Sequence, residues 1–332
     1  ALMIPLSPEA LLFVAIALTF DFFNGLHDSS NVVATVISTR ALAPRSALWL
    51  AAIANGVGPL IFGVAVATTI GDEVVAEEAI TLPVVYAALL AAIGWNVITL
   101  LFGIPSSTSH ALIGGMMGAV WGGFGFEALQ LSGLTKILIA LFFSPVIGGL
   151  AGFLVIRLLF FLARAATPHI NVWFQRGQLV SSTTLAMSHG SNDAQKTMGI
   201  ITLGLVATGD LATFEVPLWV ILASATAIAM GTLFGGWSLI RTLGGKFYRV
   251  RPIHGFSAQT ASSVVILGAA LLGGPVSTTH VVSSAIVGAG SAERVQKVRW
   301  GVVNNIVMSW LLTIPAAALL SALIYTLIEP VF

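Results

Sequence analysis

The chain contains no cysteine and few charged residues. The absence of cysteine excludes disulfide bonds and thiolate metal sites. Only 8% of the 332 residues are Asp, Glu, Lys or Arg, against roughly 25% in soluble domains. The net charge of +1 offers no basic surface for nucleic acid. We therefore expect neither a soluble domain nor a nucleic-acid partner.

Hydrophobic residues make up 57% of the chain, and its mean hydropathy is +0.99. Apolar stretches of about 20 residues, long enough to cross a bilayer, fill nearly the whole length. The alternating ten-residue pattern typical of a β-barrel is absent. The run 11–20 has no basic residues before it and no small-residue cleavage site, so we interpret it as a first transmembrane helix. The composition predicts an all-α polytopic membrane protein in a lipid bilayer.

Charge in the loops predicts the orientation. One set of loops holds the acidic residues Glu9, Asp72, Glu73, Glu77, Glu78, Glu127, Asp210, Glu215 and Glu329. The alternate set holds the basic residues Arg40, Arg45, Arg157, Arg164, Arg176, Arg241, Lys246, Arg249, Arg251, Arg294, Lys297 and Arg299. Lys and Arg mark cytoplasmic loops. We therefore predict a protein of the plasma (inner) membrane with both termini outside.

The apolar segments form two matching series. They cover 8–39, 45–70, 81–103, 107–124 and 133–163, then 178–208, 215–241, 255–273, 277–292 and 297–328. The first series starts outside and the second inside, which is the inverted repeat of many transporters. We assign residues 1–163 to the first repeat, 164–178 to a cytoplasmic connector and 179–332 to the second repeat.

Two features of these repeats are predicted to be irregular. The first segment of each half is expected to break near Asp28 and near Asp193. Residues 81–124 and 255–292 are either full passes or re-entrant hairpins. We favour hairpins, because their tips then lie near the midplane, where irregular backbone survives only when it is buried or lines a wet cavity.

Each predicted hairpin tip carries a run of hydroxyl residues. Pro105-Ser-Ser-Thr-Ser-His110 recurs as Pro275-Val-Ser-Thr-Thr-His280. Ser and Thr cap the free N–H groups at a helix start, and such a start binds anions. This combination suits a tetrahedral oxyanion. Alternatively, these hydroxyls bond only to their own backbone or hold helices together, but the repetition in both halves favours a binding role.

Asp28 and Asp193 are acidic residues within apolar segments. A carboxylate at membrane depth costs about 2.5–3.5 kcal/mol, so it indicates function. Together with backbone and Asn carbonyls, these carboxylates suit a hard cation such as Na⁺. The alternative for Asp193 is a structural pair with Lys196, one helical turn away. Asp21 also lies in the first segment, but it has no counterpart in the second half and receives no role here.

Four histidines stand beside these motifs: His27, His110, His189 and His280. Histidine can relay protons at physiological pH. No pair of them has the spacing of metal ligands on one helix. We favour a neutral, hydrogen-bonded packing role for all four.

The motifs together resemble the inorganic phosphate transporter (PiT) family of cation-coupled phosphate symporters. The resemblance rests on Gly25-Leu-His-Asp28, on Ser188-His-Gly-Ser-Asn-Asp193-Ala-Gln-Lys196-Thr-Met-Gly199, and on the two hydroxyl tips. It covers essentially the whole chain and implies a compact member of prokaryotic type. A family-typical Gly-Ala-Asn-Asp appears here as Gly25-Leu26-His27-Asp28, so His27 replaces the asparagine.

The resemblance implies a secondary active transporter that imports phosphate by Na⁺-coupled symport with alternating access, with no cofactor besides the coupling ion. It places phosphate at Ser107, Thr108, Ser109, Ser277, Thr278, Thr279 and Asn192. It places Na⁺ at Asp28 and Asp193. We add Asn24 and Gln195 as further Na⁺ ligands, because they stand close to these aspartates in the sequence.

Several alternatives remain open at this point. They are coupling to H⁺, transport of sulfate, an intramembrane aspartyl protease and a passive channel. The Gly-x-Gly-Asp run of such proteases is absent, since Asp193 stands in Asn-Asp-Ala. The architecture is compatible with a homodimer, which no residue specifies.

Overall fold

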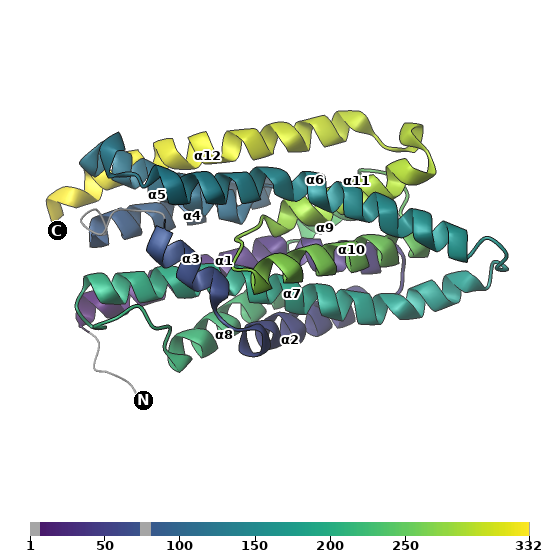
Figure 1. Ribbon diagram of the computed structural model, residues 1–332, viewed down its shortest axis with the longest axis horizontal. Coiled ribbons are helices and arrows are strands. Elements are labelled where there is room, and N and C mark those ends of the chain that lie inside the picture. The colour runs from purple at the N-terminus through teal and green to yellow at the C-terminus, as the bar shows by residue number, and fades with distance from the viewer. Residues whose placement is uncertain (1–6, 74–80, 332) are drawn as a thin grey trace.

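Helices account for nearly all of the computed structural model, which describes residues 7–73 and 81–331 (Figure 1). In the first half, the helices are α1 (Pro8–Ser38), α2 (Pro44–Phe62), α3 (Ala65–Glu73), α4 (Leu82–Phe102), α5 (Thr108–Phe124) and α6 (Leu131–Leu162). In the second half, they are α7 (Ile170–Ala207), α8 (Leu218–Phe234), α9 (Trp237–Gly245), α10 (Pro252–Leu271), α11 (Thr278–Glu293) and α12 (Trp300–Ile328). No strand occurs in these ranges, so the all-α prediction is confirmed. Glu77 and Glu78 lie outside the described residues.

Several helices are long and apolar enough to cross a membrane. They are α1, α2, α4, residues 137–162 of α6, and α12. Helices α8 and α9 together make a further candidate span that is bent by 71°. The length and apolar character of these helices match the predicted multi-pass membrane protein.

The two halves interlock instead of forming separate domains. Helix α1 packs against α8, and its counterpart α7 packs against α2. In the same way α6 packs against α11 while α12 packs against α5, and α3 contacts α7 while α9 contacts α1. Each of these contacts therefore has a counterpart. The counterpart is formed by the equivalent helices of the other half, whose numbers differ by six. This pseudosymmetry agrees with a duplicated architecture, and these six contacts all lie between the halves.

The predicted helix breaks at Asp28 and Asp193 are wrong. Helices α1 and α7 run through both residues without interruption. Neither stretch contains a proline that would remove a backbone hydrogen bond, and the carboxylates bond to side chains instead of to the helix backbone. The chain breaks instead in the second segment of each half, at Gly63 (φ 82°) after α2 and Gly235 (φ 74°) after α8. Glycine adopts this left-handed backbone without steric cost.

Two helical hairpins occur at the predicted positions. Helices α4 and α5 pack against each other, as do α10 and α11. In Figure 1, the α4–α5 hairpin lies in the half of the bundle nearest the C-terminus, and the α10–α11 hairpin lies in the opposite half. Gly103 (φ 63°) follows α4 and Gly273 (φ 73°) lies just beyond α10. The Ser109 hydroxyl lies 3.5 Å from the carbonyl oxygen of Val276, so the two tips meet inside the molecule.

The connector between the halves is shorter than predicted. Helix α6 ends at Leu162 and α7 begins at Ile170, so most of residues 164–178 belongs to α7. Pro168 precedes the helix, and no proline follows it in α7, so nothing delays the helix start until residue 178. Helix α1 begins and α12 ends at the same end of the bundle (Figure 1), as an inverted pair of repeats requires.

Candidate functional site

The two hairpin tips meet α1 and α7 around a pair of buried carboxylates. Asp28 on α1 is 1% exposed and Asp193 on α7 is fully buried. Both lie in helix interiors, where the backbone amides bond within the helix. Their carboxylates must therefore find donors on other side chains.

Threonines from the tips supply most of those donors. The Thr278 hydroxyl lies 2.9 Å from Asp193 Oδ2 and 3.2 Å from Asp28 Oδ2. Thr279 donates to Asp28 Oδ1 at 3.1 Å, and Thr108 lies 3.4 Å from Asp28 Oδ2. A hydroxyl has a single proton, so Thr278 can donate to only one carboxylate at a time. The second tip therefore links the two aspartates through the shared Thr278 hydroxyl, and Thr108 of the first tip adds a contact to Asp28.

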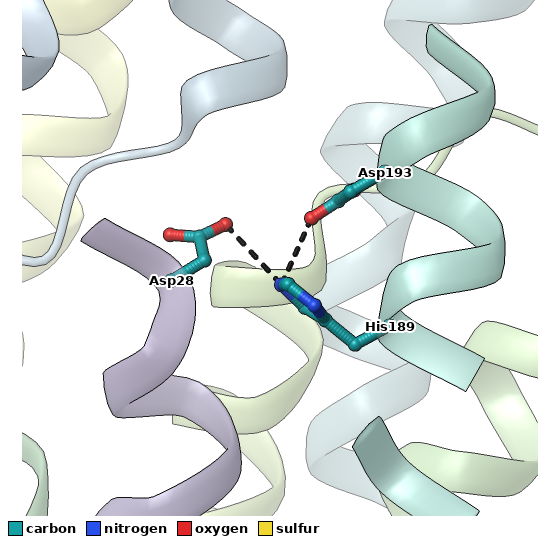
Figure 2. A group of neighbouring side chains, drawn as sticks. All are labelled: Asp28, His189 and Asp193. Atoms are coloured by element: carbon teal, nitrogen blue, oxygen red, sulfur yellow. Dashed lines mark ion pairs between the residues drawn. The ribbon is translucent and has the colours of Figure 1, made fainter. Parts of the chain in front are cut away.

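His189 lies between the two carboxylates, as Figure 2 shows. Its Nε2 is 3.0 Å from Asp193 Oδ2 and 3.7 Å from Asp28 Oδ2. Its Nδ1 is 3.2 Å from Asn55 Oδ1, and the Asn55 amide donates to Thr232. Both ring nitrogens thus face acceptors, an arrangement that an imidazolium satisfies. A neutral ring with its proton on Nδ1 would instead offer the Nε2 lone pair to a cation.

Asp28, His189 and Asp193 can together hold a metal ion. One ligand atom from each lies within 4.8 Å of the others. Carboxylate oxygen and imidazole nitrogen are ligands for several metals. The prediction from the sequence concerned pairs of histidines only. It missed the pair of His189 and Asp193, which stand four residues apart on one face of α7.

Lys196 provides the site with a fixed positive charge. Its ammonium group pairs with Asp193 Oδ1 and donates to the Ser109 hydroxyl at 2.6 Å and the Val276 carbonyl at 2.9 Å. The pair between Asp193 and Lys196 considered from the sequence therefore exists, but it also links α7 to both tips. In the first half, Asn31 stands at the matching position and donates to Thr279.

The remaining tip residues have other partners. Ser107 and Ser277 cap α5 and α11 by accepting hydrogen bonds from the backbone N–H of His110 and His280. Ser109 contacts Lys196 instead of a carboxylate. These hydroxyls therefore shape the tips, whereas Thr108, Thr278 and Thr279 face the aspartates.

Three further predicted residues lie beside the carboxylate pair without contacting it. The Asn192 amide donates to the Gly274 carbonyl at 3.2 Å, behind the second tip. Gln195 accepts from the backbone N–H of Val66 at 2.7 Å and so supports α3. Asn24 is buried one helical turn before Asp28, and its Oδ1 has no hydrogen-bond partner.

The histidines divide into two kinds. His110 and His280 stack with ring centroids 4.5 Å apart, and their ring nitrogens lack partners, so they pack without the expected hydrogen bonds. His27 Nδ1 lies 2.7 Å from Asp28 Oδ1. The expected hydrogen-bonded role therefore fits His27, whereas His189 is more than a packing residue, because its Nε2 lies between the two carboxylates.

Comparison with known proteins gives a consistent result. A family model described as "Phosphate transporter family" matches residues 24–321. The chain is 46% identical over 314 residues to a probable low-affinity inorganic phosphate transporter of Rhizobium meliloti (strain 1021), covering 94% of each chain. It is 44% identical over 331 residues to a protein so described from Bacillus subtilis (strain 168), covering 97% of this chain and 98% of the relative. A solved structure titled "The sodium-dependent phosphate transporter" matches with a TM-score of 0.88 at 25% identity, covering 98% of this chain and 100% of the other.

Proposed function

Since this chain belongs to the phosphate transporter family, we propose that it imports inorganic phosphate by Na⁺-coupled symport with alternating access. Family membership makes it a multi-pass membrane protein that transports phosphate and is not an enzyme. The coupling ion, the direction of transport and the ligand residues are the proposed part.

One observation carries the proposal: the tip hydroxyls donate to the buried carboxylates. Thr278 and Thr279 bond to Asp28 or Asp193, and phosphate oxygens would accept the same protons. Phosphate and the aspartates therefore compete for one set of donors. A cation bound to the carboxylates removes that competition. It takes the place of the hydroxyls as partner of the carboxylates, so the hydroxyls are free to donate to phosphate.

The charges support the same order of binding. Asp28 and Asp193 bring two negative charges, and Lys196 offsets one of them. A phosphate would add one or two more negative charges in a fully buried site, where unpaired charge is strongly unfavourable. Cations that enter first make the site neutral or positive before the anion arrives. The need for the cation is the coupling.

We assign phosphate to Thr108, Thr278 and Thr279, with the predicted Ser107, Ser109, Ser277 and Asn192 shaping that site. Asp28 and Asp193 are the proposed Na⁺ ligands, with the Nε2 atom of His189 between them. A tenfold Na⁺ gradient stores about 1.4 kcal/mol per ion. Two ions would therefore support roughly a hundredfold accumulation of phosphate.

Alternating access fits the opposite placement of the two hairpins. The α4–α5 hairpin reaches the site from one end of the bundle and the α10–α11 hairpin from the other (Figure 1). Withdrawal of one tip would open the buried aspartates towards one side while the other tip keeps the second side closed. In the proposed orientation, the termini and the α4–α5 hairpin face outside.

The test is uptake of radiolabelled phosphate into proteoliposomes with an imposed Na⁺ gradient, an imposed H⁺ gradient or neither. We expect uptake to require Na⁺ and to resist competition by sulfate. Asp28→Asn and Asp193→Asn should each weaken the Na⁺ dependence and lower uptake. Normal coupled uptake in both variants would contradict the cation assignment.

Coupling to H⁺ is the second candidate, and His189 is the observation that favours it. Its two ring nitrogens face Asp193 and Asn55, so a proton can bind between the carboxylates. Uptake driven by a pH gradient in the absence of Na⁺, and abolished by His189→Gln, would support this mechanism. Inhibition by sulfate as strong as that by unlabelled phosphate would show that the site does not distinguish the two oxyanions.

A further inference from the structure

Asp21 is a buried carboxylate that the proposed central site does not use. It lies on α1, two helical turns before Asp28, and is fully buried. Neither of its carboxylate oxygens has a hydrogen bond of good geometry, although the Thr197 hydroxyl and the Asn24 side chain lie close enough to favour its charged form. Removal of a charged carboxylate from water is strongly unfavourable, so this side chain needs a positive partner, either a cation or a proton.

Two neighbouring side chains also present unpartnered oxygens. The Thr197 hydroxyl and the Asn24 side chain lie beside the Asp21 carboxylate. The Thr197 Oγ1 and Asn24 Oδ1 atoms are buried and, like the carboxylate oxygens, make no hydrogen bond of good geometry. The position therefore gathers four oxygen atoms that can accept or coordinate and that lack a positive partner.

Helix geometry places this group next to the central site. Asp21, Asn24 and Asp28 follow one another at spacings of three and four residues, which align them on one face of α1. On α7, His189, Asp193 and Thr197 repeat every four residues. Helices α1 and α7 pack against each other, and both Asp193 and His189 act electrostatically on Asp21. Seven residues of helix span about 10 Å, so two charge sites fit along this face.

We propose that Asp21, Asn24 and Thr197 form a second binding site for a monovalent hard cation, which is Na⁺ if the proposed function holds. Carboxylate, amide and hydroxyl oxygens are the ligands that such cations prefer. A single carboxylate matches a single positive charge, so the bound group is neutral. The inference rests on the proposed function, because Na⁺ is its coupling ion.

The site also explains how a second cation contributes to phosphate binding. Asp21 acts on Asp193 and His189 as a further negative charge. Neutralisation of Asp21 by a cation lowers the negative potential at the central site and so favours an anion there. Asn24, predicted from the sequence to bind the same cation as Asp28, belongs in this account to the Asp21 site.

The first experiment is equilibrium binding of radiolabelled Na⁺ to the purified full-length protein without phosphate. We compare the wild type with Asp21→Asn and Thr197→Val. Asp210→Asn is the matched control, because that carboxylate already accepts hydrogen bonds from Thr208 and the backbone of Ser7. We expect Asp21→Asn to bind roughly one Na⁺ fewer, Thr197→Val to bind it several-fold more weakly, and the control to match the wild type.

The second experiment is the Na⁺ dependence of phosphate uptake. In the wild type the Hill coefficient for Na⁺ should exceed 1, and in Asp21→Asn it should fall to about 1. Phosphate uptake at saturating Na⁺ shows that the variant is folded. Unchanged Na⁺ binding and an unchanged Hill coefficient in Asp21→Asn would overturn the inference.

Two other results are equally decisive. Loss of a pH dependence of uptake in Asp21→Asn, with Na⁺ binding intact, would make Asp21 a proton site and overturn the cation assignment. Absence of Na⁺ binding and Na⁺-dependent uptake in the wild type itself would contradict the proposed function, whatever the variants do.

Discussion

The Thr278 hydroxyl is shared between the two buried carboxylates, and this contact leads to a first prediction. Thr278→Val keeps the shape of the side chain and removes the donor. Hydrogen bonds to charged groups are worth about 1.5–3 kcal/mol. We expect the KM for phosphate to rise at least tenfold, because the hydroxyl is a proposed phosphate donor, while Thr278→Ser retains most of the affinity. Phosphate uptake in proteoliposomes at fixed Na⁺ measures this.

A matched control for Thr278 lies on α7. Thr202 is equally buried, but its hydroxyl bonds only to the Met198 carbonyl of its own helix. Thr202→Val should therefore leave the KM within about twofold. Equal effects of the two substitutions would show that general packing, and not the shared hydroxyl, determines affinity.

Lys196 makes the two halves electrostatically unequal, because Asn31 stands at the matching position of α1. Lys196→Gln removes the fixed charge that offsets Asp193. We expect the variant to depend more steeply on Na⁺ and to bind phosphate at least tenfold more weakly at low Na⁺, since cations must then supply the missing charge. Phosphate binding across a Na⁺ titration measures both effects.

Lys297→Gln is the control for Lys196→Gln. Lys297 also pairs with an acid one helical turn away, Glu293, but it is 44% exposed. An exposed pair of this kind contributes little. An unchanged Na⁺ titration in Lys196→Gln would contradict the charge balance proposed for the site.

At the level of residues, the sequence predicts which residues form the site better than it predicts which groups they contact. The cost of a carboxylate at membrane depth selects Asp28 and Asp193, and the repeated hydroxyl run selects Thr108, Thr278 and Thr279. The position of His189 between the carboxylates was not predicted. Its role depends on which acceptors its two nitrogens meet, and two of the three, Asp28 on α1 and Asn55 on α2, are far away in the sequence.

At the level of elements, long apolar runs predict helix extents to within a few residues, except at the start of α7. The breaks were misplaced because polar motifs suggested them, whereas glycines cause them. Gly63 and Gly235 adopt left-handed backbone, and periodicity alone does not distinguish such a glycine from one used for close packing.

Close crossing of helices gives a prediction at this scale. A Cβ at Gly25 of α1 would meet the backbone of Ile228 on α8, and a Cβ at Gly190 of α7 would meet the backbone of Asn55 on α2. These two crossings are counterparts in the two halves. Gly25→Ala and Gly190→Ala should each destabilise the protein by about 1–3 kcal/mol, which a lower midpoint of thermal unfolding in detergent would reveal.

Gly268→Ala is the control for the crossings. Gly268 lies inside α10, and no atom beyond the neighbouring backbone of its own helix lies within 4 Å of an added Cβ. Alanine there should be neutral or stabilising by about 0.5–1 kcal/mol. Gly190→Ala should in addition weaken uptake, because Asn55 orients His189. Equal unfolding midpoints for all three variants would show that the crossings tolerate a methyl group.

For the whole molecule, the inverted repeat and the basic loops predict that the loop between α6 and α7 is cytoplasmic and that the loop between α7 and α8 is outside. The natural absence of cysteine allows a direct test. Thr167→Cys and Thr213→Cys place single thiols in these two loops, and both positions are exposed. In intact cells, a membrane-impermeant maleimide should label Thr213→Cys and spare Thr167→Cys. The reverse pattern would invert the proposed orientation.

The most direct test of the central claim is equilibrium binding of radiolabelled phosphate to the purified protein in Na⁺ and in choline at equal ionic strength. If cations must first release the tip hydroxyls from Asp28 and Asp193, phosphate should bind at least tenfold more tightly in Na⁺. That difference should shrink in the double variant Asp28→Asn and Asp193→Asn. Equal affinity in Na⁺ and choline for the wild type would contradict the claim that a cation at the carboxylates controls phosphate binding.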